Sequence, residues 1–123
     1  MAKTREEVVM GILKLLQSRV PDVEAAGVVD IDGLPISMVV PSEVDEDVVA
    51  AMSAAILSNS ERAIEELKRG NFEQVYISGT EGSILMNRCG KEALLTVVAR
   101  PKAKLGLMFL DIKRAANEIV KIL

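Results

Sequence analysis

The sequence predicts an α+β fold in which helices pack on one mostly antiparallel sheet, within a single domain spanning residues 1–123. Three observations predict this fold. Three segments carry apolar residues at helical spacing, five shorter segments read as strands, and neighbouring strands are joined by hairpin-length links. Links this short join antiparallel neighbours, because a parallel pair needs a crossover of about a dozen residues or more. The predicted order is α-β-β-α-β-β-β-α, an α+β sandwich.

The first helix is predicted over residues 4–20, "TREEVVMGILKLLQSRV". Thr4 and Glu7 stand at the spacing of a capping box, which marks a helix start. Pro21 follows the segment and ends it, because proline cannot continue a helix. The apolar positions recur at helical spacing and are Val9, Ile12, Leu13, Leu16 and Val20.

The stretch "DIDGLPIS", residues 30–37, permits two interpretations. A calcium loop would need an oxygen ligand where Leu34 stands and a glycine where Pro35 stands, so the metal site is rejected. The alternative is a hairpin, because Asp-Gly is a favoured two-residue turn between apolar runs. We therefore predict strands over about residues 24–31 and 34–40, joined by Asp32 and Gly33.

A long helix is predicted over about residues 43–69, with acids at its start, Lys68 and Arg69 at its end, and Gly70 as the C-cap. We expect one face to cover the sheet, formed by Val49, Met52, Ile56, Ala63 and Leu67. A second set is also apolar or small and comprises Val48, Ala51, Ala54, Ala55, Leu57, Ser58 and Ser60. These are either surface residues chosen for helix propensity or a second packing surface. We favour a surface that meets another chain, because apolar groups on two faces indicate burial on two faces.

Three strands and a helix complete the chain, with strands over residues 72–79, 83–89 and 93–100 and the helix over 105–123. The predicted buried face of this helix carries Met108, Ile112, Ala115, Ala116, Ile119 and either Ile122 or Leu123. "ALLTVVA" is apolar on both faces, which is typical of a central strand covered on both sides. "FEQVYIS" alternates, as an outer strand does, and residues 72–78 include no proline, lysine or arginine. If this strand lies at an edge, its free backbone groups need a partner, and a second copy would supply one. We therefore expect a homodimer.

The composition argues against several classes of function. The chain has no histidine and one cysteine, so Ser-His and Cys-His nucleophile pairs are excluded, and we expect no catalytic residue, metal or cofactor. We expect Cys89 to be structural. A net charge of −3 and an aromatic content of 2% argue against nucleic-acid binding. The N-terminal segment is charged, and no apolar stretch approaches the roughly 18 residues of a membrane span. We therefore expect a cytoplasmic protein without direct membrane insertion.

Three segments together resemble the roadblock/dynein light chain family: "VVDIDGLPIS", "ISGTEGSILMNRCG" and "LLTVVARPKAKLGLMFLDIKRAANEI". The likeness runs from Val8 to the end of the chain and is strongest to the prokaryotic single-domain branch, which includes bacterial polarity regulators that stimulate a partner's GTP hydrolysis. The resemblance implies a five-stranded antiparallel sheet with one long helix on one face and two helices on the other. It also implies a homodimer in which the third strand pairs with its copy to form a ten-stranded sheet.

The resemblance further implies where partners bind. The dimer interface would consist of Met52, Ala55, Ile56 and Asn59 of the long helix with Val75, Tyr76 and Ile77 of the strand. The partner would be a small Ras-like GTPase, and this chain lacks the phosphate loop of such an enzyme. An arginine finger that enters the partner would come from Arg62, Arg69 or Arg88, with Arg62 as the best candidate for a partner contact. The alternative is that each of them is a solvated charge, and the resemblance does not favour the finger. The alternative function is that of a structural scaffold subunit in a larger motor or membrane-associated complex.

Overall fold

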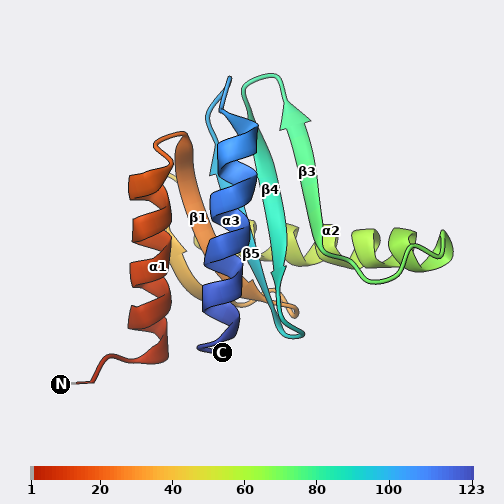
Figure 1. Ribbon diagram of the computed structural model, residues 1–123, viewed down its shortest axis with the longest axis horizontal. Coiled ribbons are helices and arrows are strands. Elements are labelled where there is room, and N and C mark those ends of the chain that lie inside the picture. Colours follow the sequence, from red (N-terminus) through yellow and green to blue (C-terminus); the bar gives the residue numbers. More distant parts are fainter. Residues whose placement is uncertain (1) are drawn as a thin grey trace.

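The computed structural model describes residues 2–123 and confirms the predicted element order (Figure 1). The helices are α1 (Arg5–Arg19), α2 (Glu46–Glu66) and α3 (Leu105–Val120). The strands are β1 (Val23–Asp30), β2 (Pro35–Val39), β3 (Gln74–Gly79), β4 (Gly82–Cys89) and β5 (Ala93–Ala99). They form one antiparallel sheet with the order β2-β1-β5-β4-β3.

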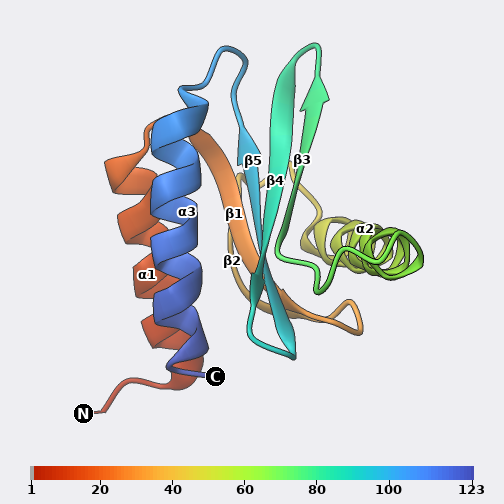
Figure 2. The ribbon, with the colours of Figure 1, turned by 45° about the vertical axis from the view of Figure 1, so that its right-hand side comes forward.

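The sheet separates two helical layers, with α1 and α3 on one face and α2 on the other (Figure 2). The α+β fold class is therefore confirmed, including the five strands and the division of the helices. Strand β5 lies at the centre, as "ALLTVVA" predicted, and nearly all of its residues are buried. A strand apolar on both faces can be stable there because each face is covered by a separate apolar cluster.

The larger cluster lies between the sheet and the α1/α3 layer. The side chain of Thr4 accepts a hydrogen bond of 3.1 Å from the backbone N–H of Glu7, so the predicted N-cap of α1 is present. Helix α3 buries the face that its periodicity predicted, namely Met108, Ile112, Ala115, Ala116 and Ile119. Both helices therefore run along the sheet with apolar stripes facing β1, β4 and β5.

The link between β1 and β2 is longer than the predicted two-residue turn, because β1 ends at Asp30 and β2 begins at Pro35. The carboxylate of Asp30 accepts hydrogen bonds from the N–H groups of Asp32 and Leu34, at 2.9 and 3.0 Å. Gly33 has a φ of +91°, which glycine adopts without steric cost. Asp30 therefore holds the turn together as an Asx-turn, in which an aspartate side chain bonds to the backbone two residues on.

Helix α2 begins and ends three residues inside the predicted bounds of 43 and 69. It begins after Asp45, whose carboxylate accepts from the N–H groups of Asp47 and Val48. At the other end, Lys68 has a φ of 54°, and the N–H groups of Lys68 and Arg69 donate to the carbonyls of Glu65 and Ile64. This is a Schellman motif with lysine in the left-handed position, so the prediction that Gly70 forms the C-cap is wrong.

The prediction of which α2 face covers the sheet is also partly wrong. Met52, Ala63 and Leu67 are exposed, and the buried residues are Ala50, Ser53 and Leu57. The physical reason is close packing. A Cβ atom on Gly33 would lie 3.5 Å from Cβ of Ala54 and 3.9 Å from the carbonyl oxygen of Ala50, so only small side chains fit between α2 and this turn. The C-terminal part of α2 then extends past β3 (Figure 1).

Candidate protein interface

The two outer strands differ in how well they are protected against pairing. Strand β2 has five residues, begins with Pro35, and its ladder to β1 is irregular at Val28 and Val29. Strand β3 pairs with β4 through six consecutive residue pairs without interruption. Proline and bulges block strand addition, and β3 has neither. The outer-strand position predicted for "FEQVYIS" is confirmed, and β3 is the sheet edge open to another strand.

The free backbone groups of β3 follow from its hydrogen-bond pattern. The N–H of Arg88 donates to the carbonyl of Glu73 at 2.9 Å. In an antiparallel ladder, hydrogen-bonded pairs alternate with pairs that make no such bonds, so Val75 and Ile77 also direct their backbone groups toward β4. The backbone groups of Gln74, Tyr76 and Ser78 therefore point away from the sheet. They form the row that another strand would engage.

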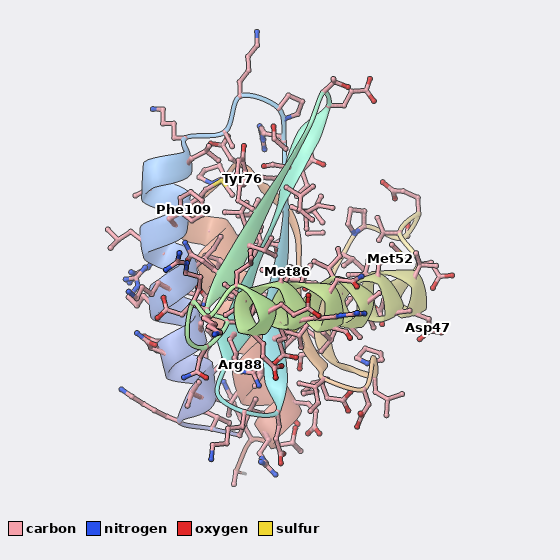
Figure 3. All side chains as sticks on the ribbon, turned by 90° about the vertical axis from the view of Figure 1, so that its right-hand side faces the viewer. Asp47, Met52, Tyr76, Met86, Arg88 and Phe109 are labelled. Carbon is pink, nitrogen blue, oxygen red and sulfur yellow. The ribbon has the colours of Figure 1, made fainter. Side chains whose placement is uncertain are left out.

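The side chains of β3 lie on both faces of the sheet. Val75 packs against the cluster beneath α2, whereas Tyr76 lies on the α3 side. There its ring meets the ring of Phe109 edge to face, with centroids 5.9 Å apart and planes at 72° (Figure 3). The sequence grouped Val75, Tyr76 and Ile77 as one patch. The structure divides them, so an interface along β3 would have a contact surface on each face of the sheet.

Helix α2 presents an exposed stripe on the side opposite the sheet. Met52, Ala55, Asn59 and Arg62 follow one another at intervals of three and four residues, and all are exposed. The Met52 side chain is 55% exposed, which is a large apolar area to leave in water. Ile56 differs from the other α2 residues that the resemblance indicated, because it is partly buried and packs against the cluster under α2.

A shallow hollow of about 290 Å³ lies on the same face of the sheet as α2, in the part that the helix leaves uncovered. Its apolar floor is formed by Ile77, Ile84 and Val98, and the acids Glu24 and Glu81 lie at its rim. Figure 3 shows Met52 above α2, on the flank toward the upper part of the β3–β4 hairpin, and Arg88 below the helix. The exposed stripe and the hollow therefore lie on the same face of the sheet, and Ile77 of β3 lines the hollow.

The arginines have distinct surroundings. Arg62 is exposed and forms an ion pair with Glu66 on the next turn of α2, at 3.3 Å. Arg88 donates to Glu61 at 2.6 Å and to the carbonyls of Gly90 and Lys91, and thereby ties the β4–β5 turn to α2. Arg88 is thus engaged within its own chain, a role that sequence reasoning missed because Glu61 is 27 positions away. Arg62 is the more available of the two for a contact with another molecule.

Cys89 is buried in the cluster under α1 and α3, as expected for a structural cysteine. Burial raises the pKa of its thiol to about 12, although a backbone hydrogen bond at Leu95 opposes the shift. A protonated, enclosed thiol is a poor nucleophile at neutral pH. Within residues 2–123, no group of three or more His, Cys, Asp or Glu side chains is arranged to hold a metal ion. None of the helices in this range has the length and apolar character needed to cross a membrane.

The sequence model described as the Roadblock/LC7 domain matches residues 11–99, from within α1 to the end of β5. The chain belongs to the Roadblock/LC7 family. This match confirms the resemblance that the three sequence segments indicated.

Individual relatives agree with this assignment. The uncharacterized protein MJ0310 of Methanocaldococcus jannaschii is 38% identical to this Roadblock/LC7 chain over 97 residues, which cover 79% of this chain and 84% of that protein. A solved structure described as MglB with tetrameric arrangement superposes with a TM-score of 0.90 at 21% identity, covering 99% of this chain and 92% of that one. MglB of Myxococcus xanthus gives 0.89 at 22% identity with the same coverage. At these identities, the two structures establish the Roadblock/LC7 fold.

Proposed function

We propose that this Roadblock/LC7 chain is a homodimeric, non-catalytic interaction module that binds a small Ras-like GTPase. The observation that carries the proposal is the unprotected β3 edge beside the exposed stripe of α2. An open strand edge pairs with other chains unless it is blocked or covered, and a second copy covers it symmetrically. The two strands then run antiparallel across a two-fold axis and extend the sheet.

The shape of the protomer supports this two-fold arrangement. The end of α2 extends past β3 on the face that also contains the uncovered hollow. A two-fold axis perpendicular to the sheet places the half of that face covered by α2 in one copy beside the uncovered half in the other. The projecting end of one α2 then faces the uncovered hollow of the other copy. The projecting end of each α2 then lies over Ile77 and Ile84 of the partner, and Leu67, which is 69% exposed in the protomer, becomes buried.

The charges of the two surfaces are complementary. Lys68 and Arg69 follow the end of α2, and Glu24 and Glu81 lie at the rim of the hollow. In the two-fold arrangement, the cations of one copy approach the acids of the other. Such rim charges mainly set orientation and the rate of association, so we expect dimerisation to slow as salt concentration rises.

The GTPase assignment rests on the family resemblance. In the dimer, the two α2 helices lie side by side and form one continuous platform, with Arg62 exposed on each. A platform of this kind can bind a GTPase without any catalytic group of its own. The platform is compatible with stimulation of GTP hydrolysis, because contact with it can remodel the switch loops of the partner. It is equally compatible with binding that leaves the hydrolysis rate unchanged.

The dimer is tested with Met52→Glu. Because Met52 is exposed in the protomer, the new carboxylate leaves the fold intact but is buried or repelled at the interface. Sedimentation velocity should show a dimer for the parent chain and at least a tenfold weaker dimer for the variant. Ser18→Glu is the matched control, because Ser18 is exposed on α1, on the other face of the sheet, and should leave the dimer unchanged. A Met52→Glu protein that dimerises like the parent contradicts the assigned interface.

The GTPase is tested by a pull-down from native lysate with the tagged chain, in parallel with GDP and with a GTP analogue. A small GTPase enriched in one nucleotide state is then purified and assayed for binding and for hydrolysis with the parent chain and with Arg62→Ala. Enrichment of large scaffold proteins regardless of nucleotide would refute the regulatory function.

A second candidate function is that of a scaffold subunit attached through the α1/α3 layer. Leu15, Leu107 and Leu110 are exposed there, and Leu110 is 69% exposed. The cations Arg19, Lys113 and Lys121 are also exposed on these two helices and on the turn that follows α3. Leu110→Glu should abolish capture of a scaffold and leave the dimer intact, whereas Met52→Glu should have the converse effect.

A further inference from the structure

The two sides of the molecule carry opposite charge. Residues 2–19 and 100–123, which form α1, α3 and the loop before α3, contain ten cations and four acids. Residues 20–99, which form the sheet and α2, contain five cations and fourteen acids. The modest net charge of −3 therefore combines an α1/α3 layer with a charge of +6 and a remainder of the chain with a charge of −9.

Most cations of the α1/α3 layer are not used within the chain. Two of the ten form ion pairs, Arg100 with Asp22 and Arg114 with Asp111. The other eight are exposed and form no ion pair with an acid within residues 2–123. Their charge is therefore available to an anionic partner.

Exposed leucines lie among these cations. On α3, Leu110 and Lys113 are three residues apart and lie opposite the buried stripe that packs on the sheet. Leu110 is 69% exposed. On α1, Leu15 and Arg19 are one helical turn apart, and both are exposed. The outer side of the layer thus mixes aliphatic with cationic side chains, so it suits a partner with both an apolar and an anionic part.

The outer side of the layer offers no groove between its helices. Helices α1 and α3 lie side by side and run in opposite directions (Figure 1). The depression between them is lined by Leu15, Arg19, Arg114 and Glu118, among others, and has a volume of only about 10 Å³. This is roughly the room that one water molecule needs. A partner helix docks by placing side chains in a groove, so the layer fits a planar partner better.

The proposed dimer would enlarge this face. In the protomer, the α1/α3 layer and α2 lie on opposite faces of the sheet (Figure 2). A two-fold axis perpendicular to the sheet leaves both α1/α3 layers on one side of the dimer and both α2 helices on the other. The dimer then presents one basic face with twice the charge of the protomer's. This step alone rests on the proposed homodimer.

We propose that the α1/α3 layer binds the surface of an anionic lipid membrane. Its cations lie among the anionic headgroups, Leu15 and Leu110 contact the boundary between headgroups and acyl chains, and no segment spans the bilayer. Apolar contact and attraction to anionic lipids act together in binding of this kind. An aromatic content of 2% leaves little for bases to stack on, which favours lipid over nucleic acid. The α2 platform then faces away from the membrane.

The test is flotation of the full chain with vesicles at a salt concentration of about 0.1 M. Vesicles of phosphatidylcholine are neutral overall, and vesicles with an equal part of phosphatidylglycerol are anionic. The parent chain should float only with the anionic vesicles, and less of it as salt rises. Lys113→Gln should weaken binding roughly fivefold for each copy on the surface, the ratio expected for one cation at an anionic leaflet. Leu110→Ala should weaken binding without changing its salt dependence.

Lys91→Gln is the matched control. Lys91 is exposed on the β4–β5 turn, which Arg88 ties to α2, so its charge lies behind the helix layer. The variant should bind like the parent, because charge interactions with a membrane fall off within a Debye length of about 10 Å. Equal binding to both kinds of vesicle, or binding of Lys113→Gln as tight as that of the parent, refutes the proposal.

The other occupants are tested in the same way. A parent chain that does not float refutes the membrane, and binding of duplex DNA or capture of an acidic protein through Lys113 then assigns the face to that partner. Sedimentation velocity separates the proposal from the dimer. A monomeric parent that floats with anionic vesicles refutes the dimer and supports the membrane face, and a dimeric parent that does not float has the converse meaning. No GTPase enters these assays, so their outcome is independent of that assignment.

Discussion

The contact between Ser53 of α2 and Thr96 of β5 yields a prediction with a definite sign. The Ser53 hydroxyl lies 2.7 Å from the carbonyl oxygen of Val49 and 2.8 Å from the Thr96 hydroxyl. A hydroxyl donates only one hydrogen, and the carbonyl can only accept. Ser53 therefore donates to Val49, and Thr96 donates to Ser53. Both residues are almost fully buried, so neither hydroxyl can turn to water.

This direction makes the two deletions unequal. Ser53→Ala leaves the Thr96 hydroxyl buried without an acceptor, which costs about 1–3 kcal/mol. The greater helix propensity of alanine offsets about 0.5 kcal/mol of this cost. Thr96→Val keeps the shape of the side chain and leaves Ser53 bonded to Val49, so the loss should stay below about 1 kcal/mol. The double variant should resemble Thr96→Val, because it contains no unpaired hydroxyl.

The assay is urea unfolding followed by far-ultraviolet circular dichroism, with all proteins at one concentration because the proposed dimerisation would add to the apparent stability. The double-mutant cycle should give a coupling of about 1 kcal/mol between Ser53 and Thr96. If Thr96→Val is as destabilising as Ser53→Ala, or if the effects add, the assigned direction of the hydrogen bonds is wrong.

Three further predictions concern the backbone and the buried thiol. Lys68→Gly should raise the free energy of unfolding by about 0.5–1 kcal/mol in the same assay, because Lys68 occupies a left-handed conformation with a φ of 54°. Gly82→Ala should lower it by about 2 kcal/mol or more, since Gly82 has a φ of 141° and a Cβ atom there would lie 2.5 Å from the carbonyl oxygen of Ala99. Stability should also fall as pH rises, because burial raises the pKa of Cys89 from 9.0 to about 12. Below pH 9 the thiol is protonated in both the folded and the unfolded state, whereas above pH 9 only the unfolded chain loses the proton. The free energy of unfolding should therefore be about 2 kcal/mol lower at pH 10.5. A Cys89→Val protein should lack this part of the pH dependence, and an equal slope in both proteins would contradict the shift.

The sequence was sufficient for the order of the elements because each element has its own local signal. Helical spacing, a Thr4 cap and Pro21 define α1, and a strand apolar on both faces predicts the central β5. The buried stripe of α3 followed from the same periodicity. These signals depend only on residues close together in the chain, so they can be read without knowing the tertiary contacts.

The tertiary structure decided how α2 is rotated and what its ends do. Met52 and Leu67 are apolar and fit a core face as well as Leu57 does, so periodicity could not choose between them. The choice came from packing, because Ala50 and Ala54 are small enough to lie against Gly33 of the β1–β2 turn, and Ser53 is small enough to reach Thr96 of the sheet. The Schellman motif at Lys68 was also invisible in the sequence, since Gly70 gave a stronger local signal.

The candidate interface was indicated partly by the sequence and partly by the tertiary structure. The sequence by itself indicated an unprotected strand and a second apolar face on α2, because it contains no blocking residue in one and extra apolar residues in the other. Only the tertiary structure put β3 at the edge, separated Tyr76 from Val75, and brought the hollow at Ile84 beside the helix. The physical reason is that local sequence fixes the period of each element, whereas the contacts between distant elements determine which of its faces remain exposed.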